Sequence, residues 1–465
     1  MPQKEKQFIY LHIATTVAVT AVAITKQRDM RFYDRTSEIA TLRNIEQSSK
    51  ESAQMTMMIG RRRVGKTTLL KNAFNDASPV LYFFVAKKNE VLLCEEFRRE
   101  AEEKLNLPLG GYDSFAEFFR AIMKLSSRMN FTLIIDEFQE FRNVNSSVFS
   151  DMQNIWDAEK DASKINLVLC GSIYSMMKRI FENSKEPLFG RATSRMIIKP
   201  FDIAAIKEIL AEHHPKYTNE DLLAFYMVTG GVAKYIEQLV IRKAFTKKAI
   251  FDAIFSEGSF FIDEGRDVLV DEFGRDYGNY FSVLSLIASS KTDRGDIEST
   301  LNMAVGGYLD KLEKEYNIIK RTRPFGAKEG SRSNKYLIDD NFLNFWFRFI
   351  YKYRSAVEIG NLDYVRNIVE RDYETYSGII LEKYFRTQMI ESKQFSDIQG
   401  YWNSKGENEI DIVAVNEMKK SLLFCEVKRN LKRINLNILE EKATDIVKKF
   451  PKFDIRYKGL SLEDM

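Results

Sequence analysis

Short apolar runs alternate with segments of helical periodicity over the first half of the chain. The runs lie at residues 55–60, 80–85, 131–136, 165–170 and 196–198. Short apolar strands separated by helices predict a parallel sheet that helices cover on its faces. The pattern therefore predicts a five-stranded α/β domain.

The pattern changes from Asp276 onward. Three short amphipathic helices precede a β-hairpin at residues 318–337, an order that predicts a winged helix-turn-helix. The aromatic segment at residues 341–354 is expected to be a packed helix rather than a platform for stacking bases. Residues 406–429 then predict two strands joined by a polar turn, after a helical stretch that contains Glu382.

Residues 8–24 form a mostly apolar run behind Lys4 and Lys6. This outline is typical of a signal peptide or a short membrane anchor, although His12 and several threonines make it a weak spanning helix. The alternative is that translation starts at Met30 and that residues 1–29 are an extension. We expect no stable membrane association unless residues 8–24 are a real anchor.

At about 100–200 residues per domain, the length of 465 residues predicts about three domains. Lysines and arginines (70) nearly balance aspartates and glutamates (66), so a basic site must be local. Three widely spaced cysteines argue against a disulfide framework and indicate a reducing, cytoplasmic setting. Three histidines leave little material for histidine-based catalysis or metal sites, so carboxylates, lysines and backbone are expected to carry the chemistry.

The first apolar run leads into GRRRVGKTT, which fits the phosphate-loop pattern G-x-x-x-x-G-K-[ST]. The glycines let consecutive N–H groups point at phosphate oxygens, at the positive end of the following helix. Lys66 supplies a positive charge to the β- and γ-phosphates, and the Thr67 hydroxyl can serve as a ligand for Mg²⁺. The motif predicts an ATP site, and a chance match on a glycine turn is the alternative. The expected nucleotide-binding residues of this loop are Gly60, Arg61, Arg62, Arg63, Val64, Gly65, Lys66, Thr67 and Thr68. For its three arginines, solvated loop charge and substrate contact both stay open.

The third apolar run ends in the acidic pair Asp136 and Glu137. Asp136 is expected to bind the nucleotide's metal through water, and Glu137 to polarise the water that attacks the γ-phosphate. The alternative is that the two acidic residues only mark the polar end of a buried strand and have no catalytic role. Because the acidic strand comes third in the chain, the order suggests the subclass with an extra strand between the two nucleotide strands.

Two further residues are candidates for the γ-phosphate. Ser172 follows the fourth strand and is expected to sense the nucleotide, while capping of the next helix is the alternative. Arg191, in PLFGRAT, is a candidate cationic finger from the same chain or from a neighbouring copy. An ordinary surface arginine is the alternative.

Six stretches between Phe32 and Val240 carry a family resemblance: RFYDRTSEIATL, GRRRVGKTTLL, LIIDEFQ, LVLCGS, PLFGRAT and TGGVAKYI. Together they resemble the prokaryotic archaeal-type ATPase family, a branch of the P-loop ATPases related to AAA+ and STAND proteins. The resemblance implies that Phe32, Tyr33 or Arg35 lies near the adenine, whereas an amphipathic first helix explains the same residues without a ligand. The family usually has proline where this chain has Ala233, so no sensor role is carried over to residues 230–234.

The hairpin at residues 318–337 concentrates positive charge. It contains six basic residues and one acid: Lys320, Arg321, Arg323, Lys328, Arg332, Lys335 and Glu329. Such a local excess is typical of contact with phosphate backbones, and the preceding helix would present Tyr308, Lys311 and Lys314 to a groove. We therefore expect DNA as a partner. The alternative is that the winged helix serves as a lid or a protein contact, or that the hairpin is only a solvated basic loop.

Asp411 lies in the first strand of residues 406–429, and Glu426 and Lys428 lie two residues apart at the end of the second, hence on one face. Two carboxylates on neighbouring strands can hold Mg²⁺ at a scissile phosphate while a lysine orients the attacking hydroxide. Glu382 is the candidate fourth member of this site. The spacing resembles the PD-(D/E)XK restriction-endonuclease-like fold, and the archaeal-type family is known to carry such a domain at its C-terminus. A salt-bridged strand edge on an inactive nuclease domain is the alternative.

The predicted fold is thus α/β, with a P-loop parallel sheet and helical lid, a winged helix-turn-helix, and a restriction-endonuclease-like domain. The predicted boundaries are 1–29 (extension or anchor), 30–240, 241–355 and 356–465. The predicted function is ATP hydrolysis coupled to DNA binding, with Mg²⁺-dependent DNA cleavage as a further option. The alternative is a nucleotide-dependent regulator or scaffold whose nuclease-like domain is inactive and only binds nucleic acid or protein. Assembly of several copies is left open.

Overall fold

The computed structural model describes residues 31–74, 78–274, 277–328, 333–403 and 408–465. The apolar run at residues 8–24, and with it the choice between an anchor and an extension, lies outside these ranges. Within them, no helix combines the length and the apolar character needed to cross a membrane.

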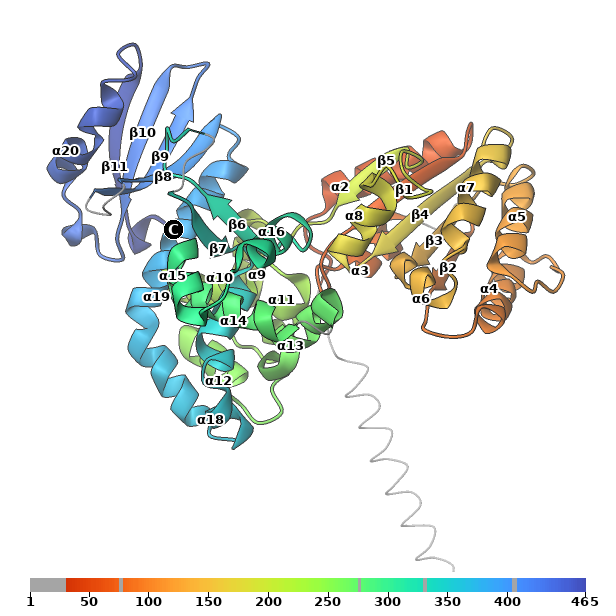
Figure 1. Cartoon of the computed structure of the whole chain (residues 1–465), viewed down its shortest axis with the longest axis horizontal. Coiled ribbons are helices and arrows are strands. Elements are labelled where there is room, and N and C mark those ends of the chain that lie inside the picture. Colours follow the sequence, from red (N-terminus) through yellow and green to blue (C-terminus); the bar gives the residue numbers. More distant parts are fainter. Residues whose placement is uncertain (1–30, 75–77, 275–276, 329–332, 404–407) are drawn as a thin grey trace, which may run out of the picture. The chain divides into compact units, whose positions relative to one another are not determined.

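Parallel strands form the sheet of the first domain in the order β2-β3-β4-β1-β5 (Figure 1). The strands are β1 (Gln54–Ile59), β2 (Val80–Phe84), β3 (Phe131–Asp136), β4 (Ile165–Gly171) and β5 (Ser194–Ile197). β4 pairs with both the phosphate-loop strand β1 and the acidic strand β3. The predicted five-stranded sheet, with a strand inserted between the two nucleotide strands, is confirmed.

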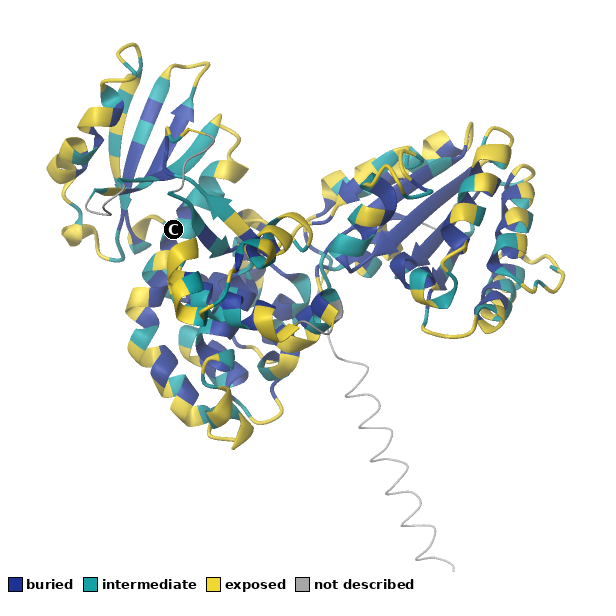
Figure 2. Cartoon of the chain, viewed as in Figure 1, coloured by how far each residue is buried: buried dark blue, intermediate teal, exposed yellow. Residues whose placement is uncertain are grey.

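Amphipathic helices cover this sheet and bury its strands, which are largely dark blue in Figure 2. The helices are α2 (Thr36–Ser49), α3 (Lys66–Ala73), α4 (Glu90–Leu105), α5 (Phe115–Ser126), α6 (Phe141–Val144), α7 (Val148–Glu159) and α8 (Tyr174–Glu182). α5 illustrates the sequence logic: Ser114 caps its first turn by accepting from the Glu117 amide, and Phe115, Phe118 and Ile122 recur at helical spacing on the buried face.

A helical region follows the sheet domain. It consists of α9 (Ile203–His213), α10 (Asn219–Thr229), α11 (Ala233–Ile241), α12 (Lys247–Ile254), α13 (Phe260–Phe273), α17 (Asn341–Phe345), a π-helix (Trp346–Tyr351) and α18 (Arg354–Glu358). The aromatic segment packs inside it, since Trp346 donates to the Ile262 carbonyl at 2.8 Å. A Cβ on Gly265 would lie 2.2 Å from the Trp346 ring, so the glycine makes room for it. The expected packed helix is confirmed.

The winged helix-turn-helix is present between α13 and α17. It consists of α14 (Tyr277–Ala288), α15 (Arg294–Leu301), α16 (Gly306–Lys314) and the antiparallel wing strands β6 (Ile319–Thr322) and β7 (Lys335–Ile338). α14 packs against α16 and β7, so the helices and the wing form one small core.

The C-terminal domain is a mixed sheet flanked by helices. Its elements are α19 (Leu362–Glu391), β8 (Asp397–Trp402), β9 (Glu409–Asn416), β10 (Ser421–Val427), α20 (Leu436–Val447) and β11 (Asp454–Leu460). The strand order is β11-β10-β9-β8, with only the β10–β11 pair parallel among the described strands. The two strands predicted at residues 406–429 are β9 and β10, and the predicted α/β class of this part is confirmed.

Candidate functional site

The phosphate loop joins β1 to α3, as the motif predicts. Gly65 has a φ of 92°, a left-handed conformation that glycine adopts without strain, and a Cβ on Gly60 would lie 2.9 Å from the buried Val64. Lys66 donates from Nζ to the Gly60 carbonyl at 2.6 Å, and its burial lowers the pKa of the ammonium. Thr68 lies in the first turn of α3. The loop therefore encloses a cationic group that a phosphate oxygen would bind more strongly than a carbonyl does.

Thr67 and Asp136, the predicted magnesium-binding pair, lie side by side. Thr67 Oγ1 donates to Asp136 Oδ2 at 3.3 Å, and the Tyr82 hydroxyl from β2 donates to the same oxygen. Burial, followed by the hydrogen bond to Asp136, raises the pKa of Tyr82. A hydroxyl beside a carboxylate at the phosphate loop is a donor set that fits Mg²⁺, which prefers oxygen ligands.

Glu137 follows Asp136 in a left-handed conformation, with φ 52° and ψ 39°. Its amide donates to Asp136 Oδ1 at 2.9 Å. Its carboxylate oxygen Oε2 accepts from two donors, the Gln139 amide and the Ser172 hydroxyl, the latter at 2.8 Å. The structure thus brings together Lys66, Asp136 and Ser172 around this acid, because neighbouring parallel strands end at one edge of the sheet.

Ser172 does not cap the following helix. α8 begins after Ile173 and has no side-chain cap, while the Ser172 hydroxyl is directed at Glu137. The capping alternative is therefore wrong, and sensing of the nucleotide stays a prediction.

Arg63 of the phosphate loop forms a two-pronged ion pair with Glu264 of α13. Nε lies 3.0 Å from Oε1 and Nη2 lies 3.2 Å from Oε2. Tyr235 also donates to Glu264 Oε1 at 3.2 Å, and the guanidinium lies over the Phe260 ring at 5.3 Å. Burial raises the pKa of Glu264. The Arg63 side chain is thus held by an ion pair while it is still 40% exposed, and substrate contact stays a prediction.

The other two loop arginines also reach residues beyond the sheet domain. Arg61 pairs with Asp340 at 3.1 Å and donates to the Asn317 carbonyl at 2.5 Å. Arg62 donates to the Asp267 carbonyl at 3.5 Å. The loop is therefore tied to α13, to the turn before β6 and to the cap of α17.

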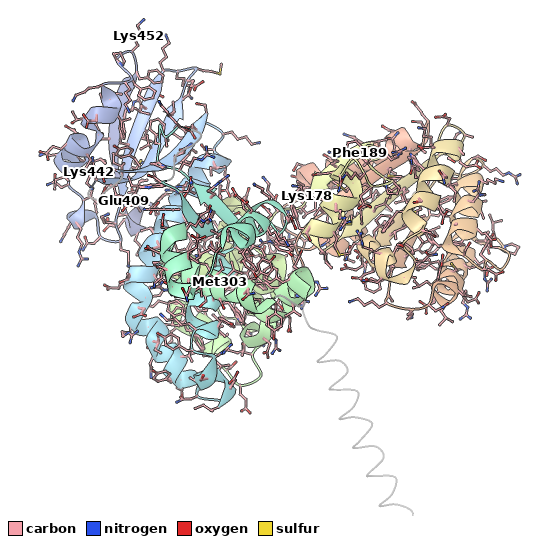
Figure 3. All side chains as sticks on the ribbon, viewed as in Figure 1. Lys178, Phe189, Met303, Glu409, Lys442 and Lys452 are labelled. Carbon is pink, nitrogen blue, oxygen red and sulfur yellow. The ribbon has the colours of Figure 1, made fainter. Side chains whose placement is uncertain are left out.

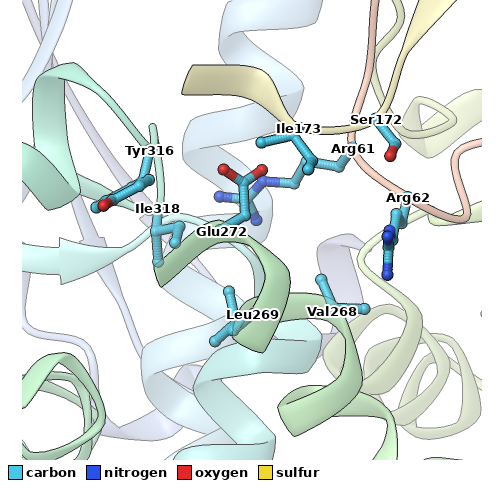
Figure 4. A pocket seen from close by; sticks show the side chains of 9 residues that line it. All are labelled: Arg61, Arg62, Ser172, Ile173, Val268, Leu269, Glu272, Tyr316 and Ile318. Atoms are coloured by element: carbon cyan, nitrogen blue, oxygen red, sulfur yellow. The ribbon is translucent and has the colours of Figure 1, made fainter. Parts of the chain in front are cut away.

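A pocket lies next to these contacts (Figure 4). Its lining residues are Arg61, Arg62, Ser172, Ile173, Val268, Leu269, Glu272, Tyr316 and Ile318. Glu272 of α13 accepts from the Tyr174 amide at 3.0 Å and from the Ser175 hydroxyl at 3.1 Å, and burial raises its pKa. α13 thus contacts both the phosphate loop and the start of α8.

Arg191 lies away from the phosphate loop. It precedes β5, whose first residue pairs with Thr56 in β1, so it lies at the edge of the sheet where the strands begin. The phosphate loop follows the opposite end of β1. Arg191 also pairs with Asp157 at 3.0 Å. A finger acting within the same chain is therefore wrong, and action from a neighbouring copy stays a prediction.

Arg35 and residues 230–234 pack onto the phosphate loop. Arg35 is 4% exposed and donates to the carbonyls of Lys199 (2.6 Å) and Val64 (3.4 Å). The Lys234 amide donates to the Arg63 carbonyl at 3.1 Å. These contacts brace the loop through the protein backbone. The nearness of Phe32, Tyr33 or Arg35 to the adenine stays a prediction.

In the C-terminal domain, Asp411 of β9 and Glu426 of β10 meet at Lys428. Lys428 Nζ lies 2.8 Å from Glu426 Oε1 and 3.4 Å from Asp411 Oδ2, which also accepts from the Val427 amide at 2.7 Å. Burial raises the pKa of Asp411. Burial by itself would lower the pKa of Lys428, but the hydrogen bond with Glu426 and the charge of Asp411 raise it overall. The structure brings these three predicted residues together.

A second lysine also faces Glu426. Lys442 of α20, labelled in Figure 3, lies 3.7 Å from Glu426 Oε2. That oxygen is buried and accepts no hydrogen bond within the described part of the chain. A buried carboxylate oxygen that accepts no hydrogen bond, beside a second carboxylate, fits a divalent cation such as Mg²⁺.

Glu382 is linked to Asp411 through an arginine. It pairs with Arg386, which donates to the Asp411 carbonyl at 2.8 Å, and burial raises the pKa of Glu382 to about 7. Over the described ranges, no group of three or more His, Cys, Asp or Glu residues lies at metal-binding spacing. The carboxylate of Glu382 is thus paired with an arginine in this structure, and its role as a metal ligand stays a prediction.

The basic wing packs against the C-terminal domain. Phe325 is buried in that domain's apolar core, its amide donates to the Gly400 carbonyl at 2.8 Å, and its ring lies 5.8 Å from that of Phe450. Lys335 pairs with Glu409 at 2.8 Å. Part of the hairpin at residues 318–337 is therefore fixed to another part of the chain, and its contact with a phosphate backbone stays a prediction.

Some of the basic residues predicted to contact phosphate backbones form no ion pair within the described part of the chain. Lys320, Arg323 and Lys328 have no ion pair among the residues that the structure describes, whereas Arg321 pairs with Glu313 at 3.4 Å. Glu329 and Arg332 lie outside those residues. In α16, Lys311 is exposed, Lys314 pairs with Asp310 at 3.3 Å, and Tyr308 accepts from Asn279 at 2.9 Å.

Sequence reasoning missed three residues of these sites: Tyr82, Gln139 and Lys442. Gln139 had a signal, since it lies two positions after Glu137 in a stretch already singled out. Tyr82 carries a polar hydroxyl within an apolar strand, which is a weaker signal of a functional residue. Lys442 reaches Glu426 only through the packing of α20 on the sheet, which no local pattern encodes.

Comparisons with known proteins agree with this geometry. Residues 32–239 match the model of an ATPase domain predominantly from Archaea, and residues 346–442 match a model of archaeal and bacterial proteins of unknown function. An uncharacterized protein of Methanocaldococcus jannaschii, MJECL04, is 28% identical over 412 residues, which cover 85% of this chain and 87% of that protein.

Two solved structures are similar over much of the chain. The Walker-type ATPase PABY2304 of Pyrococcus abyssi has a TM-score of 0.52 at 18% identity and covers 68% of this chain and 96% of its own. The ORC2 protein of Aeropyrum pernix, solved in ADPNP–ADP complexes, has a TM-score of 0.44 at 12% identity over 74% and 96% of the chains. The first likeness supports the fold. Together with the family model, it shows that this chain carries an archaeal-type P-loop ATPase domain.

Proposed function

We propose that this protein is an ATP-hydrolysing switch whose nucleotide state controls a winged helix and a Mg²⁺-dependent centre that cleaves DNA. The observation that carries the proposal is the set of ion pairs from the phosphate loop to Glu264 and Asp340. A phosphate group in the loop would compete with these carboxylates for the same guanidinium groups. Nucleotide binding would therefore change the contacts of α13 and of the segment after the wing.

In the ATP site, each residue has a defined task. Lys66 would leave the Gly60 carbonyl for the β- and γ-phosphate oxygens, and Glu137 would accept a proton from the attacking water. Thr67 and Asp136 would hold Mg²⁺, which supplies charge neutralisation at these oxygens. Residues Arg61, Arg62, Val64 and Thr68 would shape the loop around the phosphates, with Ser172 as the sensor.

In the C-terminal centre, Asp411 and Glu426 would hold Mg²⁺, which supplies polarisation of a scissile phosphate. Lys428 would orient the attacking water, and its paired carboxylates keep its side chain in place. The exposed Lys320 and Lys328 and the half-buried Arg323 would contact the DNA backbone, because the wing tip packs against the same domain that holds the carboxylates.

The test is incubation of the purified protein with DNA, Mg²⁺ or Mn²⁺, with and without ATP. We expect cleavage whose rate ATP changes. Asp411→Ala should abolish cleavage and keep ATP hydrolysis, and Lys66→Ala should lower ATP hydrolysis by about 100-fold, the loss typical of a removed phosphate-stabilising group. Asp445→Ala, at a side chain that is 83% exposed, is the matched control. Cleavage that survives Asp411→Ala would contradict the nuclease assignment, and normal ATP hydrolysis by Lys66→Ala would contradict the ATP site.

A nucleotide-dependent regulator is the second candidate function. It is favoured by the ion pairs of Lys428 with both carboxylates and by the packing of the wing against the C-terminal sheet, which together describe a salt-bridged edge. ATP-dependent DNA binding without cleavage, in the same experiment, would select this alternative. Arg191 from a neighbouring copy would serve either function.

We also propose that residues 30–240, 241–355 and 356–465 divide the functions of ATP hydrolysis, coupling and nucleic-acid chemistry. α19 supports one refinement, because it packs against α10 as well as against β8, β9 and β10. The third part would therefore begin within a helix that also packs against the first.

A further inference from the structure

Gln139 lies two residues beyond the acidic pair, in the short 3₁₀-helix Phe138–Glu140. Its side chain is completely buried, and its amide nitrogen donates to Glu137 Oε2. Ser172 Oγ donates to the same oxygen at 2.8 Å. Within the described ranges, no hydrogen bond reaches the other oxygen, Oε1. One oxygen of the carboxylate is therefore fixed by two donors, and the other is left to accept.

The surroundings of Gln139 are built to hold it. A Cβ on Gly171 would lie 2.6 Å from Gln139 Oε1 and 2.3 Å from Met177 Cγ, so only glycine leaves space for both side chains as they stand. Gln139 Oε1 itself is buried without a hydrogen-bond partner, which costs stability. The opposite amide orientation would place this oxygen against the Glu137 carboxylate, where two acceptors repel each other. An unsatisfied buried carbonyl at this position indicates a functional demand on the amide nitrogen.

The backbone of Glu137 points to the same demand. A left-handed conformation is uncommon for a residue with a long side chain and persists where surrounding contacts enforce it. Here the Glu137 amide donates to Asp136, while the carboxylate is held by Gln139 and Ser172. Both ends of the residue are thus fixed by hydrogen bonds.

We propose that Gln139 is the positioning residue for ATP hydrolysis, which holds Glu137 so that Oε1 faces the attacking water. The inference rests on the proposed role of Glu137. In the step concerned, the water oxygen bonds to the γ-phosphorus, the bond from phosphorus to the ADP oxygen breaks with its electron pair going to ADP, and the water proton passes to Oε1. Gln139 touches neither water nor nucleotide and acts only through the carboxylate.

The test compares Gln139→Met, which keeps the side-chain length and loses the donor, with the wild type in single-turnover ATP hydrolysis. We expect the rate to fall by about 100-fold, the loss typical of a misplaced reacting group, with the affinity for ATP unchanged. Gln153→Met, on the surface helix α7 of the same domain, is the matched control and should keep the wild-type rate.

A double-mutant cycle separates positioning from mere structural support. In a Glu137→Gln background, Gln139→Met should cause no further loss, because the group it positions is already gone. Gln139→Leu, which is shorter and also lacks the donor, repeats the comparison where Gln139→Met does not fold. A further loss in the Glu137→Gln background, an unchanged rate, or a faster basal rate from release of a restrained acid would each overturn the proposal.

Failure of the proposed role of Glu137 gives a different result. Glu137→Gln would then hydrolyse ATP at the wild-type rate, which overturns both ideas. A Glu137→Gln variant without activity, together with a fully active Gln139→Met variant, overturns the positioning role alone.

Discussion

Gly171 occupies a position at which a methyl group would strike the side chains of Met177 and Gln139. Because Met177 and Gln139 lie 2.3 and 2.6 Å from the missing Cβ, Gly171→Ala should lower the free energy of unfolding by about 1–3 kcal/mol through overpacking. ATP turnover should fall as well, since Gln139 must move. Urea denaturation and a turnover assay measure the two effects. Gly278→Ala, where a Cβ meets nothing within 4 Å, should be neutral or slightly stabilising.

Glu382 makes stability depend on pH. Burial raises its pKa from 4.5 to about 7, so the folded chain holds this proton more tightly than the unfolded chain does. Its contribution to stability is therefore complete below pH 4.5 and is lost as the pH rises towards 7. Glu382→Gln should raise the free energy of unfolding relative to the wild type at pH 8, and the difference should shrink at pH 5.

Denaturation at both pH values, without divalent cations, checks the Glu382 prediction. Glu374→Gln, at an exposed position of the same helix, is the control and should show no such pH dependence. An equal difference at the two pH values would contradict the argument from burial.

The individual residues of the ATP site were largely predictable, because their chemistry is written at short spacing. Gly60, Lys66 and Thr67 follow one strand, and Asp136 ends another. The partners of the arginines were not predictable, since Arg63 and Glu264 are 201 positions apart and meet only after the helical region has folded. The pairing of Glu382 is different, because its partner Arg386 lies only one helical turn away.

The wing shows how an element acquires a second role in the fold. Phe325 at its tip is 9% exposed and packs in the core of the C-terminal sheet. Phe325→Ala should destabilise the protein by about 3 kcal/mol, the usual cost of truncating a buried phenylalanine. Thermal and urea denaturation measure the loss. Lys328→Ala, at an exposed position of the same hairpin, should stay within about 0.5 kcal/mol of the wild type.

Elements with strong local patterns were predicted, and elements defined by distant contacts were not. The strands β1, β3 and β4 are apolar runs that are buried on both faces, so composition alone identifies them. The basic hairpin was identified as a wing, but its apolar tip was not recognised as an anchor. One phenylalanine within a charged loop gives no periodicity, and its partner strand β8 lies far along the sequence.

At the scale of the whole molecule, the contacts of α13 with the phosphate loop make a measurable prediction. ATP should increase hydrogen exchange of residues 260–273 in the wild type, because phosphate competes with Glu264 for Arg63. Arg63→Ala should show fast exchange there with and without ATP. Arg99→Ala, which breaks a surface ion pair in α4, should respond to ATP as the wild type does. Slow exchange in Arg63→Ala would contradict the coupling.

The anchored wing also determines how the chain can be divided. A fragment that starts at residue 356 would keep every strand of the last sheet and still lack Phe325, so Phe450 and its neighbours would lose an apolar partner. A fragment that ends at residue 355 would leave the same phenylalanine in water. Gene fusions, domain exchanges and truncated expression products should therefore keep residues 319–465 together.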